Sequence, residues 1–164
     1  MSEYSARVPA YTAQADPIQM QREAATMIEE SLAGRSEEEL RMRPRPGKCS
    51  VIEILAHLAN DELVNAWRYR QMIERSGCEL SAFDQDQWAR LGAYSSWHAE
   101  DAFALFRLLR ETNLRMFSHL TAEEWENWGL HAERGRITVR QLARHMAGRD
   151  RNHIDQMRAI LSRA

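Results

Sequence analysis

The sequence contains few of the residues that all-β folds and secreted scaffolds depend on. Its 164 residues include 7 glycines and 4 prolines, the residues that β-rich folds use at their turns. The two cysteines, Cys49 and Cys78, are too few for a disulfide framework and show no C-x-x-C spacing, so we expect free thiols in a reducing cytosol. These scarcities favour a helical, cytoplasmic protein.

Long apolar runs and an excess of one charge are also absent. No stretch approaches the roughly 20 apolar residues of a membrane span, and residues 1–17 lack the apolar core of a secretory signal. Lys and Arg number 22 against 24 Asp and Glu, a net charge of −2, so no basic field indicates a nucleic-acid-binding protein. We therefore expect neither a membrane nor a nucleic acid as a partner.

What the sequence does contain is the composition of one globular domain. Hydrophobic residues make up 44% and charged residues 28%, ordinary values for a folded chain. The length corresponds to a single domain at ~100–200 residues per domain. Residues 1–15 are polar and include Pro9, so we expect an N-terminal arm lying on the surface or on a partner, followed by one domain over residues 16–164.

Helix-capping patterns divide this domain into four long helices. Asp16-Pro17, the box Ser50-x-x-Glu53 and the box Thr138-x-x-Gln141 are typical helix starts. Apolar residues at helical spacing predict long helices over residues 17–34, 51–75, 96–119 and 139–162. Connections of about 20 residues separate the last three, with short helical turns near residues 84–88 and 121–124. No sustained period-two alternation indicates strands, so we predict an all-α four-helix bundle with long connections that carry short helices.

Two of these helices carry ionisable groups in or beside their apolar stripe. At ~100° per residue, the polar positions of this kind are His57, Asp61 and Glu62 on the second long helix and His145, Arg149, Asp150 and His153 on the last. A charge buried without a partner costs several kcal/mol, so these groups must pair, bind a ligand or line a wet cleft. Both a salt-bridge network and a polar functional site remain open.

Three segments resemble the motifs of the DinB/YfiT-like superfamily. PGKCSVIEILAHLANDE (46–62) is similar to the family's opening motif, FDQDQWA (83–89) to its mid-chain motif, and RHMAGRDRNHIDQM (144–157) to its closing motif. The segments follow the family's order and frame nearly the whole chain. The resemblance implies a four-helix bundle, often a homodimer, that binds a divalent metal such as zinc or nickel through three side chains.

The resemblance puts the three metal ligands at His57, Arg149 and His153. Residues four apart share one helix face, so positions 149 and 153 can converge on one ion with a ligand from a facing helix. Three protein ligands leave open positions for water or substrate. Arg149 departs from the family's pattern, because a guanidinium has no lone pair to offer.

Two arrangements around this departure remain open. In one, Asp61 or Asp150 supplies a ligand oxygen in place of the missing group. In the other, the guanidinium of Arg149 occupies the place of the cation and is held by Glu62, Asp61 or Asp150. His145 lies roughly 12 Å along the helix axis from the last ligand position and cannot easily meet it on one ion.

The family resemblance implies one function, and the arginine at position 149 implies another. Characterised relatives include transferases and isomerases that use mycothiol, bacillithiol or glutathione, in which a metal activates a bound thiol or water. For such an enzyme His57 and His153 would hold the ion, and Arg149 could bind the carboxylate of a small-molecule substrate bidentately. The alternative is a non-catalytic small-molecule-binding or dimeric interaction bundle in which Arg149 replaces the metal.

Overall fold

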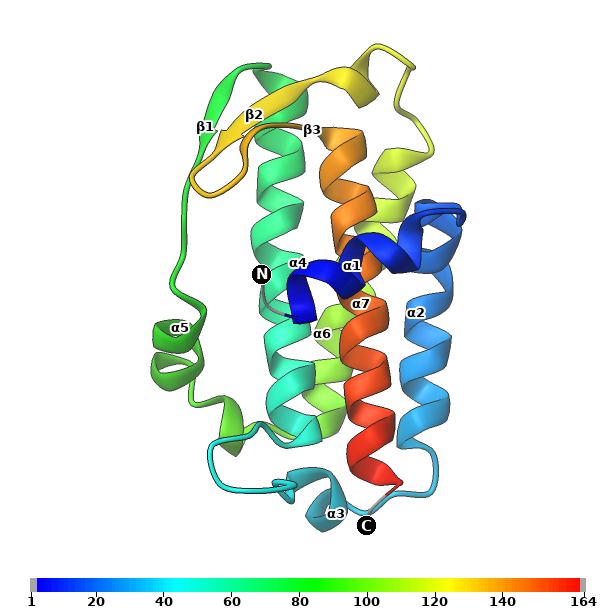
Figure 1. Cartoon of the computed structure of the whole chain (residues 1–164), viewed down its shortest axis with the longest axis vertical. Coiled ribbons are helices and arrows are strands. Elements are labelled where there is room, and N and C mark those ends of the chain that lie inside the picture. The colour runs from blue at the N-terminus through cyan, green and yellow to red at the C-terminus, as the bar shows by residue number, and fades with distance from the viewer. Residues whose placement is uncertain (1–2, 163–164) are drawn as a thin grey trace.

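The computed structural model describes residues 3–162, and four long helices packed side by side form its framework (Figure 1). These helices are α2 (Pro17–Leu32), α4 (Val51–Glu74), α6 (Ala99–Phe117) and α7 (Val139–Leu161). The connections carry the helices α3 (Glu37–Arg41) and α5 (Gln85–Leu91) and the 3₁₀ turns η1 (Tyr94–Ser96) and η2 (Glu124–Glu126). The predicted four-helix bundle is therefore confirmed. Within residues 3–162 no helix combines the length and apolarity needed to cross a membrane.

The predicted caps define where the bundle helices begin. Ser50 accepts a hydrogen bond from the Glu53 backbone, and the Glu53 carboxylate accepts one from the Ser50 backbone. Thr138 and Gln141 form the same reciprocal pair at the start of α7. Because each box satisfies two backbone N–H groups that the first helical turn leaves without partners, these starts are determined locally.

A small sheet at one end of the bundle was not predicted from the sequence. Its strands β1 (Cys78–Leu80), β2 (Trp128–His131) and β3 (Gly135–Thr138) lie in that order, with β1 parallel and β3 antiparallel to β2. Strands of three or four residues are too short to show an alternating pattern. The sheet matters for function because the β2–β3 turn lies close to the polar residues of α4 and α7.

The expected N-terminal arm contains a helix, α1 (Glu3–Thr12), that crosses α7 (Figure 1). Val8 is buried, and a Cβ at position 148 would clash with the Val8 carbonyl oxygen, so only a glycine permits this crossing. Arg144 donates a hydrogen bond of 2.9 Å to the Thr12 carbonyl. Residues 3–12 of the arm thus lie on the bundle, whereas residues 1–2 and 163–164 lie outside the described chain.

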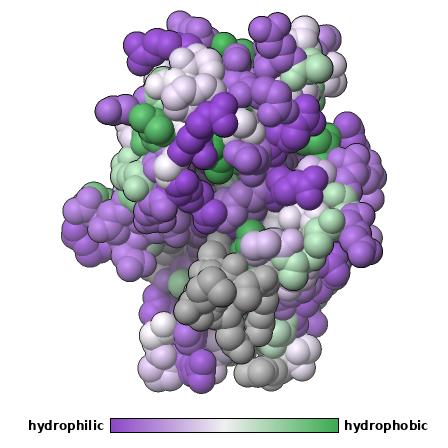
Figure 2. Space-filling model, turned by 45° about the horizontal axis from the view of Figure 1, so that its top comes forward, coloured by the Kyte–Doolittle hydropathy of each residue, from purple (hydrophilic) through white to green (hydrophobic). Residues whose placement is uncertain are grey.

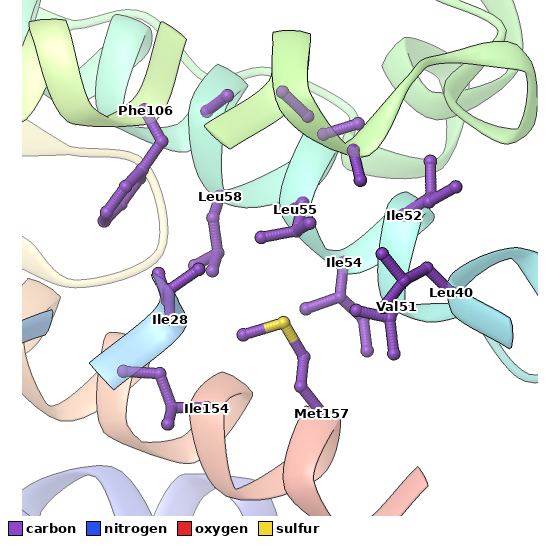
Figure 3. Packing of buried hydrophobic residues seen from close by; sticks show 14 of the residues in the cluster. Ile28, Leu40, Val51, Ile52, Ile54, Leu55, Leu58, Phe106, Ile154 and Met157 are labelled. Atoms are coloured by element: carbon purple, nitrogen blue, oxygen red, sulfur yellow. The ribbon is translucent and has the colours of Figure 1, made fainter. Parts of the chain in front are cut away.

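The apolar core forms two clusters with polar residues between them. One cluster packs around Ile28, Leu55, Phe106 and Met157 (Figure 3), and the other lies below the sheet around Tyr69. The predicted apolar stripes of α4 and α7 are buried, apart from a half-buried Ile160. They consist of Val51, Ile54, Leu55, Leu58, Tyr69 and Met72 on α4 and of Val139, Leu142, Ala143, Met146, Met157, Ile160 and Leu161 on α7. Between the clusters, α4, α6 and α7 each present charged or amide side chains to the interior. The face seen in Figure 2 is mostly hydrophilic, with hydrophobic residues in small separate patches.

Candidate functional site

The structure divides the predicted polar residues into two clusters. Glu62 and Asp150 join Arg110 of α6 in a group that we call the interior cluster. Asp61, His57 and Arg149 meet in a second group, which together with His153 we call the pocket cluster. Sequence neighbours separate in this way because consecutive residues of a helix point about 100° apart.

Arg110 is the centre of the interior cluster. Its Nε and Nη2 donate to the two carboxylate oxygens of Glu62 at 3.0 and 2.8 Å, and Nη2 also lies 2.8 Å from Asp150. Its Nη1 donates to the Gln21 carbonyl at 2.9 Å, and Asn113 donates to Glu62 at 2.8 Å. Every guanidinium nitrogen thus has a partner, and Arg110 is 1% exposed. This cluster is a buried salt-bridge network.

Burial also changes the acidity of the interior cluster. Loss of solvent raises the pKa of Asp150 from 3.8 to about 7, against the opposing effect of the nearby Arg110. The same Arg110 holds Glu62 through two hydrogen bonds. Near neutral pH the Asp150 carboxyl is therefore partly protonated.

Arg110 and Asn113 were missed from the sequence. They lie in α6 on the same stripe as Phe106 and Phe117, all four being buried. The spacing of four, three and four residues is the helical spacing that identified the polar residues of the other two helices. A search of α6 for polar residues within its apolar stripe would have found both.

In the pocket cluster, Arg149 meets the groups expected to surround a cation. Its Nη2 forms an ion pair with Oδ2 of Asp61 and donates a hydrogen bond of 2.9 Å to Nε2 of His57. That His57 nitrogen also lies 3.4 Å from Oδ2 of Asp61. The ring of His153 packs edge-on against His57, with centroids 5.0 Å apart. The guanidinium therefore occupies the point where the imidazole and the carboxylate converge.

The residues present at this point do not fit a divalent metal ion. A zinc ion would need the Nε2 lone pair of His57 at about 2.0–2.1 Å, but that nitrogen accepts its hydrogen bond from Arg149. Over the described residues 3–162, no group of three His, Cys, Asp or Glu side chains is placed to hold a metal. A metal-ligand role for His57 and His153 stays a prediction.

The histidines of the site are held neutral. Burial first, and Arg149 second, lower the pKa of His57 to about 4. Burial, His57 and Arg149 lower the pKa of His153 to about 3. Burial, Arg134 and Arg149 lower the pKa of His145 to about 3. At pH 7 these imidazoles can therefore accept or donate hydrogen bonds but carry no charge.

A cavity of about 230 Å³ opens beside the pocket cluster. Helices α4 and α7, the segment before α5 and the β2–β3 turn enclose it. Its basic and imidazole lining groups are His57, Arg68, His131, Arg134, His145, Arg149 and His153. His145, which we did not expect to share an ion with His153, lies in the wall, with Nε2 at 3.0 Å from Nη2 of Arg134.

Three basic or imidazole residues of the cavity were missed in the sequence, and they differ in whether a pattern could have found them. Arg68 follows Asp61 and Asn65 on the buried side of α4 and could have been found by its spacing. His131 and Arg134 come from the β2–β3 hairpin, which folds back over the helices and has no recognisable pattern of its own. Their place in the site depends entirely on the tertiary structure.

Comparison with known proteins finds a similar sequence and a similar fold. The chain is 22% identical over 133 residues to a protein of Oceanobacillus iheyensis named "putative metal-dependent hydrolase", covering 81% of this chain and 76% of that protein. It also matches the fold of YfiT from Bacillus subtilis, described as a probable metal-dependent hydrolase with an unusual four-helix bundle topology. The TM-score is 0.83 at 17% identity, covering 90% of this chain and 85% of that one.

The family model supports the resemblance drawn from the three sequence motifs. The DinB superfamily model matches residues 20–157, a range that contains α4, α6 and nearly all of α7. This range includes both polar clusters and the residues that line the cavity. The chain belongs to the DinB superfamily.

Proposed function

We propose that this chain is a metal-independent, small-molecule-binding member of the DinB superfamily in which Arg149 replaces the metal ion. The observation that carries the proposal is the double contact of Arg149 Nη2 with Asp61 and His57. A guanidinium is cationic at every accessible pH and donates hydrogen bonds in a fixed plane. It therefore supplies a permanent positive charge where a bound ion would otherwise be needed.

The surroundings of Arg149 oppose its replacement by a metal. Asp61 is 1% exposed. A metal ion could therefore bind its carboxylate only if Arg149 moved away from Asp61 or shared the carboxylate with the ion. Separating a buried ion pair typically costs about 3–5 kcal/mol, because one charge remains without its partner. This cost disfavours zinc or nickel at the site in the wild-type chain.

The second candidate function is a metal-dependent enzyme. It would be a hydrolase, the word that describes both relatives, or a transferase that uses a low-molecular-weight thiol, as the family resemblance implies. The observation in its favour is the pair of neutral imidazoles, His57 and His153, whose centroids are 5.0 Å apart. In this alternative Arg149 turns away from Asp61 and binds substrate instead.

Zinc titration separates the two candidates. Isothermal titration of zinc into metal-stripped wild-type protein is expected to show no binding, whereas Arg149→His is expected to bind about one ion per chain. The matched control Arg149→Gln removes the charge without adding a ligand, so it should bind none. Stoichiometric zinc binding by the wild-type protein, with a Kd of about 1 μM or tighter, would overturn the proposal.

Two expectations from the sequence accompany the proposal. We propose that the chain forms a homodimer, as the family resemblance implies, and that it works in the cytoplasm. Analytical ultracentrifugation tests the first at micromolar concentration, and a single species with the 19.1 kDa mass of one chain would contradict it.

A further inference from the structure

The cavity beside Arg149 contains more guanidinium groups than carboxylates. Arg68, Arg134 and Arg149 line it, and the carboxylate among the lining residues is Glu133. Asp61 pairs with Arg149 from within the bundle. Even after this pairing, two arginines face one exposed glutamate across about 230 Å³. The cavity therefore has a positive potential that an anion would compensate.

Two of these guanidiniums are buried without a full set of hydrogen-bond partners. Arg68 is 6% exposed and donates through Nη2 to the Ser81 carbonyl at 2.7 Å, but its Nε makes no hydrogen bond. Arg149 is 8% exposed, and its Nε likewise makes none. Arg110 in the interior cluster has a partner for each nitrogen. Of these three arginines, only the two that line the cavity have a guanidinium nitrogen without a hydrogen bond.

Part of the cavity wall is apolar. Phe83, Leu142 and Met146 line it beside the arginines, and the Arg68 guanidinium lies 5.6 Å from the centroid of the Phe83 ring. A cation next to an aromatic and aliphatic wall suits a ligand that has an anionic end and an apolar body. Inorganic phosphate has no apolar body to place against this wall.

The wall histidines respond to the same excess of positive charge. Burial, followed by Arg134 and Arg149, lowers the pKa of His145. Burial, followed by Arg68 and Arg134, lowers the pKa of His131. Both imidazoles are thus neutral at pH 7 and leave the arginines as the cationic groups of the wall.

We propose that this cavity binds a small organic acid, with its carboxylate on Arg68 and Arg134 and its apolar body against Phe83, Leu142 and Met146. The inference rests on the proposed function, because it uses the cavity without a metal ion. The cavity is smaller than the roughly 300–1,000 Å³ of sites for drug-sized ligands, so the acid is about the size of an aromatic or short-chain monocarboxylate. Arginine is suited to this task because its fork matches a carboxylate bidentately.

Calorimetry with three probes tests the chemical class of the ligand. Metal-stripped wild-type protein is titrated with benzoate, with its neutral analogue benzamide and with inorganic phosphate. Benzoate is expected to bind at least about tenfold more tightly than either of the others, because it alone combines a carboxylate with an apolar body. Equal binding of benzamide or of phosphate would overturn the inference, as would no detectable binding of benzoate.

Charge-removing variants test the location. Arg134→Gln, on the exposed β2–β3 turn, and Arg68→Gln should each weaken benzoate binding by about tenfold or more. Arg107→Gln makes the same charge change on the exposed face of α6, outside this cavity, and should leave binding unchanged. Equal weakening in all three variants would overturn the assignment. If Arg68→Gln fails to fold, Arg134→Gln decides.

The two proposals fail separately. Stoichiometric zinc binding by wild-type protein that also binds benzoate in the metal-stripped state overturns the metal-independent function and leaves the ligand class intact. Absence of benzoate binding in a protein that also binds no zinc overturns the ligand class and leaves the metal-independent function intact.

Discussion

The interior cluster and the pocket cluster are built from the same kinds of side chains, yet their arginines are satisfied to very different extents. Arg110 has a partner for each of its three nitrogens, and it lies between two carboxylates. Arg149 uses Nη2 for both of its polar contacts, and its buried Nε makes no hydrogen bond. This difference fits the proposal that the first cluster is structural and that the second belongs to a ligand site.

Helix geometry explains how one sequence makes both clusters. Asp61 and Glu62 are neighbours on α4, but Asp61 pairs with α7 and Glu62 with α6. Arg149 and Asp150 of α7 separate in the same way, since consecutive side chains point about 100° apart. The two networks thus share two helices without sharing an ion pair.

The largest expected effect comes from removing the centre of the interior cluster. Arg110→Met leaves Glu62 and Asp150 buried near each other without a cation, so we expect a loss of about 3–5 kcal/mol in the free energy of unfolding. Urea denaturation at pH 8 measures this loss. The combined variant Arg110→Met, Glu62→Gln and Asp150→Asn should recover part of it, because no buried charge is left unpaired. A loss below about 1 kcal/mol for the single variant would contradict the structural role.

The corresponding change in the pocket cluster is expected to cost less. In Arg149→Met, Asp61 keeps His57 at 3.4 Å, and water in the adjoining cavity can partly solvate the site. We therefore expect a loss of about 2–3 kcal/mol, measured by the same urea denaturation. Destabilisation as large as that of Arg110→Met would remove the distinction between the clusters.

The cavity wall and the interior cluster should also respond to pH with opposite sign. The folded-state pKa of His145 is lowered from 6.5 to about 3, so the unfolded chain binds more protons between these values and stability is lost as the pH falls below 6.5. His145→Gln should therefore reduce the loss of stability between pH 7 and pH 5 by about 1–2 kcal/mol. Urea denaturation at the two pH values measures this, and an unchanged pH dependence would count against the neutral histidine.

Titration of Asp150 in the interior cluster changes the free energy of unfolding with pH in the opposite direction. The folded-state pKa of this carboxyl is raised from 3.8 to about 7, so its contribution to stability is fully present below pH 3.8 and is lost as the pH rises through 7. Asp150→Asn should remove this component, making stability increase more steeply with pH between about 4 and 7 than in the wild-type protein. A shallower increase would show that Asp150 is ionised throughout this range.

The smallest effect is expected at an exposed ion pair, which serves as the baseline for both clusters. Arg107 and Glu111 lie 3.6 Å apart on α6, with about half of each side chain exposed. Arg107→Gln should change the free energy of unfolding by less than about 0.5 kcal/mol, since solvent screens such pairs. A loss comparable to that of Arg149→Met would mean that burial is not what makes the ion pairs of the two clusters more important than a surface pair.

Prediction from the sequence succeeded where the physical cause was local. The boxes at Ser50 and Thr138 place the starts of α4 and α7 through contacts within one helical turn. The ionisable positions of α4 and α7 were identifiable because they interrupt an apolar stripe with the helical period. Strand β1 could not be predicted, since it is held by pairing with β2, about 50 residues further along the chain. Strands β2 and β3 form a local hairpin, but with four residues each they are too short to show an alternating pattern.

By itself, the sequence determined a bundle of four helices, its caps and the helical positions at which ionisable groups enter the core. Only the tertiary structure decided which charge pairs with which: it directed Glu62 and Asp150 to Arg110 and Asp61 to Arg149, and folded Arg134 over the cavity. The physical reason is that helical periodicity sets the direction of a side chain on its own helix. The partner it meets depends on how the helices and the hairpin pack against one another.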